Sequence, residues 1–184
     1  DRPLLEAMRE SGCHYVSLGI ETGDQEILTQ CNKGVRLEKA EETIRLIHEV
    51  GIESELCFII GLPGESPDSL ARTRAFAIRM RPFATLASFA ILTPYPGTEI
   101  FHMAACGREG LHLKTCDWDQ FTKHSGAALR HRAFTDRQLK RWQARLYLEF
   151  YLGSPAKMVQ LLRSESGWEL LNARRIISML TRMF

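Results

Sequence analysis

The sequence has no apolar run close to the ~20 residues that a membrane-spanning helix needs. It also has no cysteine framework, because its five cysteines, at positions 13, 31, 57, 106 and 116, are odd in number and widely spaced. Scattered cysteines of this kind are typical of a reducing compartment, where disulfides are rare. These absences predict a cytoplasmic protein with no membrane span.

Two common nucleotide-binding motifs are missing as well. Residues 61–65 (Gly-Leu-Pro-Gly-Glu) resemble a phosphate-binding loop only superficially, because they lack the Gly-Lys-Ser/Thr ending that brings a lysine to the phosphates. The three-glycine dinucleotide fingerprint is absent too. The two glycines of this segment either make a turn or let a ligand approach the backbone closely, and the pattern leaves both interpretations open.

What the chain does contain is the composition of an ordinary globular protein, 45% hydrophobic and 25% charged. Its 184 residues suit one domain with room for a small appendage. Charge divides the chain, since residues 1–129 hold 13 Lys/Arg and 18 Asp/Glu, whereas residues 130–184 hold 11 and 4. We therefore expect an α/β unit over residues 1–129 and a basic, helical region over residues 130–184.

Three apolar runs predict strands at residues 15–20, 53–60 and 86–92. Residues 57–60 are all apolar, which is typical of a strand buried on both faces of a parallel sheet. Periodicity and capping residues predict helices at residues 1–11, 24–33, 36–50, 67–80 and 98–106. An irregular segment follows, in which we expect Trp118 and Phe121 to cover a core edge. Further helices are predicted to start near residues 135, 154 and 168. This alternation predicts a parallel sheet with right-handed crossovers, too small for a complete barrel.

Each expected strand ends in a segment that can contact a ligand. Residues 19–23 (Gly-Ile-Glu-Thr-Gly) place the Glu21 carboxylate at a strand end, where it can accept both hydroxyls of a ribose or cap the following helix. Residues 93–98 (Thr-Pro-Tyr-Pro-Gly-Thr) are stiffened by two prolines and can hold an adenine ring by its amino group or form a rigid strand exit. Ligands of α/β folds bind at the carboxyl ends of strands, so these segments are the candidate site.

Two further patterns carry alternatives. His102, Cys106, His112 and Cys116 repeat a His-x3-Cys spacing that could bind zinc, but it matches no common zinc motif, and we expect no metal site. After residue 130, basic residues alternate with aromatics, which suits either nucleic acid or a packed helix with a solvated basic face. The aromatics lie on the apolar stripe of the expected helix, and this favours the packed helix.

With the segments at residues 19–23, 61–65 and 93–98 in this order, the chain resembles the C-terminal half of a radical S-adenosylmethionine (radical SAM) enzyme, of the branch with an N-terminal cobalamin-binding domain. The resemblance covers residues 1–155 and implies the last three strands of a partial (β/α)6 TIM-like barrel, followed by a helical C-terminal appendage. The family's Cys-x3-Cys-x2-Cys loop, which holds a 4Fe–4S cluster, does not occur in this sequence. The resemblance therefore implies a fragment that lacks the cluster-binding half.

The resemblance also implies cofactors and the residues that bind them. Glu21 would meet the ribose and amino acid part of S-adenosylmethionine (SAM), the strand end at Ile60 would flank adenine, and residues 93–98 would support it. The implied cofactor-binding residues are Gly19, Glu21, Thr22, Ile60, Gly61, Pro63, Thr93, Pro94, Tyr95 and Pro96. The 4Fe–4S cluster and cobalamin would be held outside this chain. The implied partners are SAM, a small-molecule substrate and the missing N-terminal half, and not nucleic acid.

The sequence thus predicts a fragment of an enzyme that reductively cleaves SAM to a 5′-deoxyadenosyl radical, for cobalamin-assisted methyl transfer or carbon-skeleton chemistry. One alternative is a fragment similar to a tRNA methylthiotransferase of the same superfamily. The other is a non-catalytic α/β binding module that docks an acidic partner through its basic C-terminal helices. Without the cluster loop, we expect this chain alone to be inactive.

Overall fold

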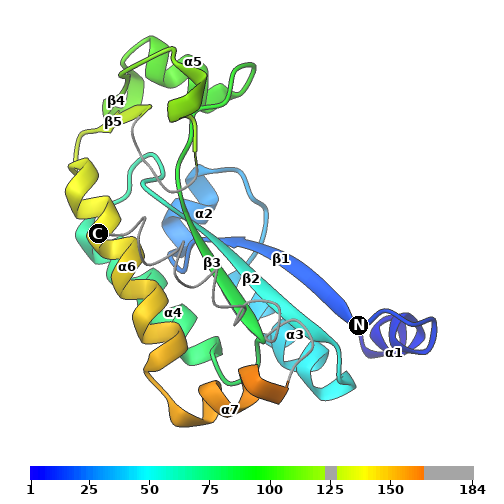
Figure 1. Ribbon diagram of the computed structural model, residues 1–184. Helices are drawn as coiled ribbons and strands as arrows, with labels where there is room; N and C mark the ends of the chain where they lie inside the picture. The colour runs from blue at the N-terminus through cyan, green and yellow to red at the C-terminus, as the bar shows by residue number, and fades with distance from the viewer. Residues whose placement is uncertain (123–127, 164–184) are drawn as a thin grey trace.

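The computed structural model describes residues 1–122 and 128–163. Its centre is a parallel sheet in the order β1 (Tyr15–Glu21), β2 (Glu53–Ile60) and β3 (Leu86–Ile91), shown in Figure 1. The helices around it are α1 (Arg2–Glu10) before β1, α2 (Gln25–Gln30) and α3 (Leu37–Val50) between β1 and β2, and α4 (Pro67–Met80) between β2 and β3. The predicted α/β fold with three adjacent parallel strands is confirmed.

Short polar side chains begin these helices where the sequence predicts. Asp1, Asp24 and Ser66 each accept hydrogen bonds from backbone N–H groups in the first turn of α1, α2 and α4. In α4, Ser69 returns the bond to the Ser66 N–H and completes a capping box. Because such caps satisfy N–H groups that a helix leaves free, helix starts are marked locally in the sequence.

The two faces of the sheet have different surroundings. Leu56, Phe58 and Ile60 of β2 point to the face covered by α3, α4 and a later helix, and each is at most 1% exposed. Cys57 and Ile59 point to the opposite face and are only half-buried. The predicted burial on both faces is therefore wrong within the described residues, because the helices there cover one face and β2 alternates accordingly.

Helix α6 (Asp136–Leu152) closes the outer edge of β3. Tyr151 Oη accepts a hydrogen bond from the Ala87 N–H at 2.9 Å and donates one to the Ala87 carbonyl at 2.8 Å. Tyr147 Oη accepts from the Phe89 N–H at 3.1 Å, and Gln143 Nε2 donates to the Phe89 carbonyl at 2.6 Å. Side chains thus satisfy backbone groups that an edge strand would leave unpaired.

The described part of the C-terminal region is mainly helical between residues 136 and 163. In α6, Tyr147 and Phe150 are buried against the sheet whereas Arg141 is exposed, so this segment is a packed helix that keeps a basic face outside. α7 (Pro155–Arg163) follows, and the helix predicted near residue 168 lies outside the described residues. The domain boundary after residue 129 stays a prediction; α6 itself shares one hydrophobic core with the sheet.

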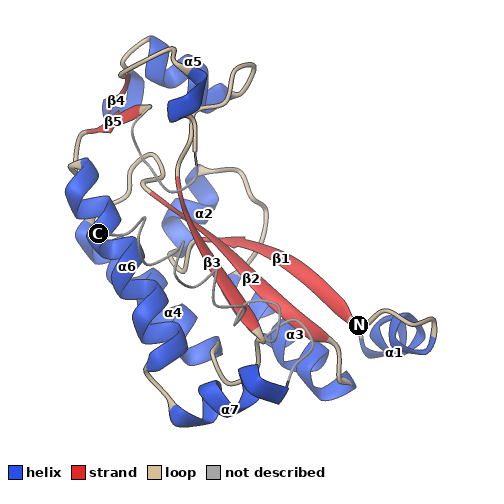
Figure 2. Ribbon diagram, viewed as in Figure 1, coloured by secondary structure: helices blue, strands red, loops and turns tan. Residues whose placement is uncertain are grey.

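A small antiparallel hairpin lies beyond the carboxyl end of β3, where the sequence indicated only an irregular segment (Figure 2). Its strands are β4 (Leu111–Leu113) and β5 (Leu129–His131), accompanied by α5 (Glu99–Ala105) and the 3₁₀ turns η1 (Arg108–Gly110) and η2 (Trp118–Gln120). Strands of three residues are too short to show alternation in a sequence. Phe121 is buried as expected, and the ring centroid of Trp118 lies 5.0 Å from that of Phe121, although Trp118 itself is 62% exposed.

All five cysteines are free thiols. No helix in the described part of the chain has the length and apolar character needed to cross a membrane.

We predict that Tyr151→Phe lowers the free energy of unfolding by about 1–3 kcal/mol, because the N–H and carbonyl of Ala87 lose their partner. Urea denaturation measures the change. Tyr95→Phe is the control, since this half-exposed residue makes only one long contact, 3.5 Å from its hydroxyl to the Phe121 carbonyl. Equal losses in the two variants would show that α6 does not stabilise the edge of β3.

Candidate functional site

The carboxyl ends of β1, β2 and β3 lie at one edge of the sheet, because the strands are parallel and adjacent. The segments that the sequence singles out, residues 19–23, 61–65 and 93–98, leave the sheet at that edge. In Figure 1, α5 and the β4–β5 hairpin lie beyond the ends of β2 and β3. The structure therefore brings the three predicted segments to a common edge.

β1 ends in a strained residue that carries a carboxylate. Glu21 has a φ of 67°, which non-glycine residues rarely adopt, and the register with β2 shifts between Gly19 and Glu21. The carboxylate accepts a hydrogen bond from Lys33 Nζ at 2.7 Å. A Cβ atom added at Gly19 would lie 2.9 Å from Glu21 Oε1 and 3.1 Å from Lys33 Nζ. The bulge thus turns a paired carboxylate back over Gly19, on the half-buried face of the sheet.

The next two residues fasten this end of β1 to α4. The hydroxyl groups of Thr22 and Thr73 are hydrogen-bonded at 2.8 Å, and both residues are fully buried. A Cβ atom added at Gly23 would lie 2.7 Å from the Cα of Thr73 and 2.6 Å from the Cβ of Phe76. Only glycine lets the backbone come this close to α4, so residues 22 and 23 hold Glu21 in place rather than face the edge.

Asp24 begins α2. Its carboxylate accepts the Glu26 N–H at 2.9 Å and pairs with Arg72 of α4 at 2.6 Å, although it is only 3% exposed. The alternative role of Glu21 as the cap of this helix is therefore wrong, because Asp24 occupies that position. The carboxylate of Glu21 therefore pairs with Lys33 and is also available to a ligand at this edge of the sheet.

A buried carboxyl group holds the turn after β2. Glu65 Oε2 accepts the N–H groups of Gly61 at 2.5 Å and Leu62 at 3.2 Å, and Oε1 has no partner among the described residues. Glu65 is 2% exposed, and this burial raises its pKa to about 8 against the lowering effect of the two backbone bonds. The Gly-Leu-Pro-Gly-Glu segment is thus a turn closed by its own acid, which is mainly neutral at pH 7.

His131 joins the hairpin to this turn. The Ala133 N–H donates to His131 Nδ1 at 3.0 Å, so the proton of the neutral ring is on Nε2, which donates to the Leu62 carbonyl at 3.1 Å. Burial lowers the pKa of His131, and the bond to the Leu62 carbonyl opposes this only in part. A neutral imidazole therefore fixes β5 against the turn that follows β2.

The segment after β3 is stiff and only partly accessible. Pro94 is buried, and the half-buried Thr93 donates its hydroxyl to the Ile91 carbonyl at 3.2 Å. Tyr95 is 51% exposed and Pro96 is exposed as well. The surface that this segment offers to a ligand therefore comes mainly from Tyr95 and Pro96.

The predicted site residues differ in how much they can offer a ligand. The side chains of Thr22 and Ile60 are buried, and the Ile60 carbonyl already accepts the Leu92 N–H at 2.9 Å. The residues with surface at the strand-end edge are Gly19, Glu21, Pro63, Thr93, Tyr95 and Pro96, while Gly61 and Pro94 are enclosed. A cofactor contact from any of these residues stays a prediction.

Sequence reasoning missed three residues that shape this edge: Lys33, Glu65 and His131. In the sequence, Lys33 marks only the end of the helix expected at residues 24–33. In the structure, its side chain reaches back to the carboxylate of Glu21 at the end of β1. Glu65 follows a Pro-Gly turn and precedes a helix cap, which is the signal of an acid that bonds the turn's own N–H groups. No local pattern announces His131, because its partner Leu62 is 69 residues away.

The two His-x3-Cys pairs form no visible metal centre. Within residues 1–122 and 128–163, no group of three or more His, Cys, Asp or Glu side chains converges as metal ligands would. The ring of His112 instead lies against Gly107, where an added Cβ would be 2.9 Å from its Cε1.

This fold and edge define an α/β protein whose parallel strands carry the candidate ligand-binding segments at their carboxyl ends. The family profile described as the Radical SAM superfamily matches residues 1–77, from α1 into α4. The N-terminal 77 residues of the chain therefore carry the pattern of the radical SAM superfamily.

Curated relatives carry more than one activity in their names. An uncharacterized methyltransferase of Pyrococcus horikoshii is 30% identical over 81% of this chain and 31% of its own length. The anaerobic magnesium-protoporphyrin IX monomethyl ester cyclase of Rubrivivax gelatinosus is 35% identical over 55% of this chain and 18% of its own. The chain thus spans less than a third of either relative.

The solved coproporphyrinogen III oxidase of Escherichia coli, described as a radical SAM enzyme, superposes with a TM-score of 0.56. The match covers 83% of this chain and 30% of that chain at 19% identity, so the likeness is one of fold. It confirms the partial-barrel architecture expected from the sequence.

We predict that Gly23→Ala lowers the free energy of unfolding by about 1–3 kcal/mol or more, because its Cβ would collide with the backbone of α4. Gly19→Ala is the matched control: its Cβ would meet only the ends of two flexible side chains, and the loss should stay below ~1 kcal/mol. Urea denaturation of both variants measures this. A Gly19→Ala loss as large as that of Gly23→Ala would contradict the arrangement.

Glu65 gives a prediction about pH. The folded chain keeps a proton on Glu65 up to a pKa of about 8, whereas the unfolded chain releases it near pH ~4.3. Stability must therefore fall as pH rises between these values, by about 1.4 kcal/mol per pH unit at most. Glu65→Gln should remove this slope, because an amide oxygen still accepts the N–H groups of Gly61 and Leu62.

Urea midpoints of both proteins from pH 5 to pH 9 test this expectation. The difference between them isolates Glu65 from His131, whose lowered pKa makes its own contribution rise with pH. Exposed Glu26→Gln serves as the control for lost charge. Parallel curves for the native chain and Glu65→Gln would mean that Glu65 is not buried as a neutral acid.

Proposed function

We propose that the chain is part of a radical SAM enzyme and that SAM binds at the carboxyl edge of β1, β2 and β3. The supporting observation is the end of β1, where a strained Glu21 holds a partly exposed carboxylate at that edge. Strain at a non-glycine residue costs of order 1–3 kcal/mol and persists where the surrounding structure fixes it, often at ligand sites. Here the anchor of residues 22 and 23 on α4 fixes it.

The residues present fit the polar end of an adenosine group. A carboxylate accepts two hydrogen bonds from neighbouring hydroxyls, so Glu21 can hold the ribose while Lys33 keeps its side chain in place. The exposed ring of Tyr95 and the adjoining Pro96 offer a rigid surface for adenine beside the strand ends. When bound beside a reduced cluster, SAM supplies the 5′-deoxyadenosyl radical.

The described residues do not fit a 4Fe–4S cluster. Such a cluster needs thiolates that converge, and no three Cys, His, Asp or Glu side chains do so in residues 1–122 and 128–163. We therefore assign the cluster, and cobalamin where it takes part, to ligands other than these residues, and we derive no step through either.

The reaction that the relatives favour is methyl transfer or carbon-skeleton chemistry on a small molecule. The match over most of this chain is to a methyltransferase, and a shorter one is to a cyclase. Relatives named as methylthiotransferases match over 54% and 42% of the chain, less than the 81% of the methyltransferase, so methylthiolation is the second candidate. A purely binding role is not favoured, since the aromatic residues of α6 pack on the sheet.

Isothermal titration with SAM tests the proposal. Glu21→Gln keeps the size of the side chain but loses its charge, and a hydrogen bond to a charged group contributes about 1.5–3 kcal/mol. We expect the dissociation constant to rise by about tenfold to a hundredfold, since ~1.4 kcal/mol is a factor of ten. Glu26→Gln removes the same charge from the exposed first turn of α2 and should leave binding unchanged. An unchanged constant in Glu21→Gln, with an unchanged urea midpoint, would refute the ribose contact.

A further inference from the structure

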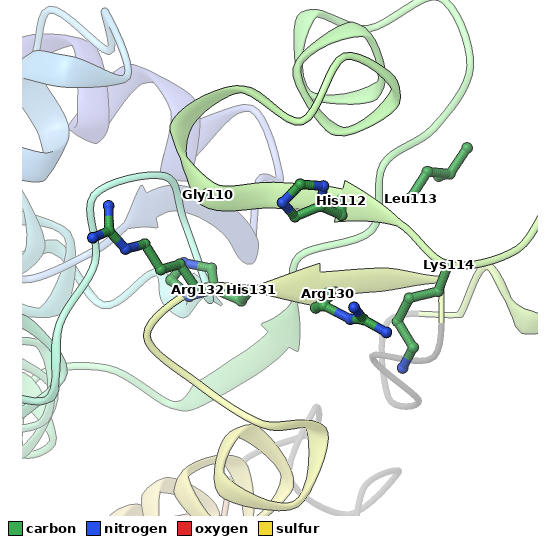
Figure 3. A pocket seen from close by; sticks show the side chains of 7 residues that line it. All are labelled: Gly110, His112, Leu113, Lys114, Arg130, His131 and Arg132. Carbon is green, nitrogen blue, oxygen red and sulfur yellow. The ribbon is translucent and has the colours of Figure 1, made fainter.

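The β4–β5 hairpin has an apolar face and a basic face. Its register pairs Leu111 with His131, His112 with Arg130, and Leu113 with Leu129. Because side chains alternate along strands, the leucines and His131 share one face, and the leucines pack in a core with Leu62 and Leu92. The opposite face carries the pair of His112 and Arg130, and the basic residues that follow each strand, Lys114 and Arg132, extend it (Figure 3).

Two glycines and one acid hold these basic side chains in place. An added Cβ at Gly107 would be 2.9 Å from the ring of His112, and one at Gly110 would be 2.6 Å from the Cβ of Arg132. Both glycines have a positive φ, so the loop before β4 is shaped to receive these two side chains. Lys114 is held by an ion pair with Asp136 at the start of α6.

The positive charge of this face is only partly offset. Among the described residues, Lys114 has an acidic partner, and no ion pair involves Arg130 or Arg132. Figure 3 shows the two side chains at different ends of this face, Arg132 beside Gly110 and Arg130 toward Lys114. An anionic ligand that reaches either guanidinium would meet a positive charge with no acidic partner among the described residues.

A cavity of about 720 Å³ lies at the hairpin, and its lining combines Gly110, His112, Lys114, Arg130 and Arg132 with Leu113 and His131 of the two strands. This volume lies within the ~300–1,000 Å³ range of small-molecule sites and far exceeds the size of a single ion. Arginine forks bind phosphate and carboxylate groups by two parallel hydrogen bonds, and the imidazole of His112 adds a donor on the opposite strand. We propose that this basic face is a binding site for a small molecule with a multiply charged oxyanion group, a diphosphate or a polycarboxylate.

The place of the site in the fold gives it a use. His131, whose ring points to the Leu62 carbonyl, ties the same hairpin to the turn at the carboxyl end of β2. An anionic group held on the hairpin is therefore anchored to the strand-end edge by a buried hydrogen bond. Anion binding at this site does not require SAM, so its test is independent of the test of the function proposed above.

Isothermal titration with inorganic pyrophosphate and, separately, with citrate tests the site and distinguishes the two anion sources. We expect saturable binding of one anion per chain, weakened by added salt because exposed charges are screened. The double variant Arg130→Gln/Arg132→Gln should weaken binding of the preferred anion by about tenfold or more. His112→Gln, exposed on the opposite strand, should weaken it as well and serves if the double variant is unstable.

The matched control is Arg9→Gln/Arg36→Gln, which removes two exposed positive charges from α1 and the start of α3, outside the cavity lining. It should bind as the native chain does. Urea midpoints of all variants show whether each is folded. Absence of saturable binding for both anions would overturn the proposal, as would an equal loss in the control or native affinity in folded Arg130→Gln/Arg132→Gln.

Discussion

The arrangement of this chain depends on how the edge of β3 is closed. A strand at the edge of a sheet exposes N–H and carbonyl groups that another strand can pair with. In β3 those groups at Ala87 and Phe89 are bound by three side chains of α6, so no further strand can add there. At the other edge, β1 pairs only with β2 among the described residues. Any further strand of this sheet must therefore pair with β1. This is what a partial barrel requires when β3 is its last strand.

The same helix positions the strand-end edge. Leu139, near the start of α6, lies against Gly61, where an added Cβ would be 3.4 Å from Leu139 Cδ1. His131 comes just before α6 in the chain and bonds the Leu62 carbonyl of the same turn. The turn after β2 is thus held from inside by Glu65 and from outside by α6 and the hairpin. Its backbone groups are used within the fold, which makes it a rigid support between the two flanking strand ends.

The sequence predicts the elements whose signals are local. The strand at residues 53–60 and the helix at residues 67–80 have the bounds found in the structure, because an apolar run and a Ser-Pro cap mark their ends. The contacts between distant residues are different. Tyr147 and Tyr151 form an apolar stripe in the sequence, and nothing nearby shows that their hydroxyls serve a strand 58 and 64 residues away. The position of Glu21 at a strand end marks it as a candidate ligand residue, but its strain follows from a bulge that depends on the register with β2.

The three strand ends divide the work at the site unequally. The end of β2 satisfies its own backbone through Glu65 and the end of β3 is stiffened by prolines, so neither has much freedom or an accessible charged group. The end of β1 is different. The buried hydroxyl pair of Thr22 and Thr73 and the close contact of Gly23 with α4 fix its backbone, while the Glu21 carboxylate stays partly exposed. A fixed backbone with an accessible charge is what a polar ligand group needs, since little further ordering is lost on binding. In the SAM site proposed above, the selective contacts therefore fall to the end of β1, and the other two strand ends supply the shape around it.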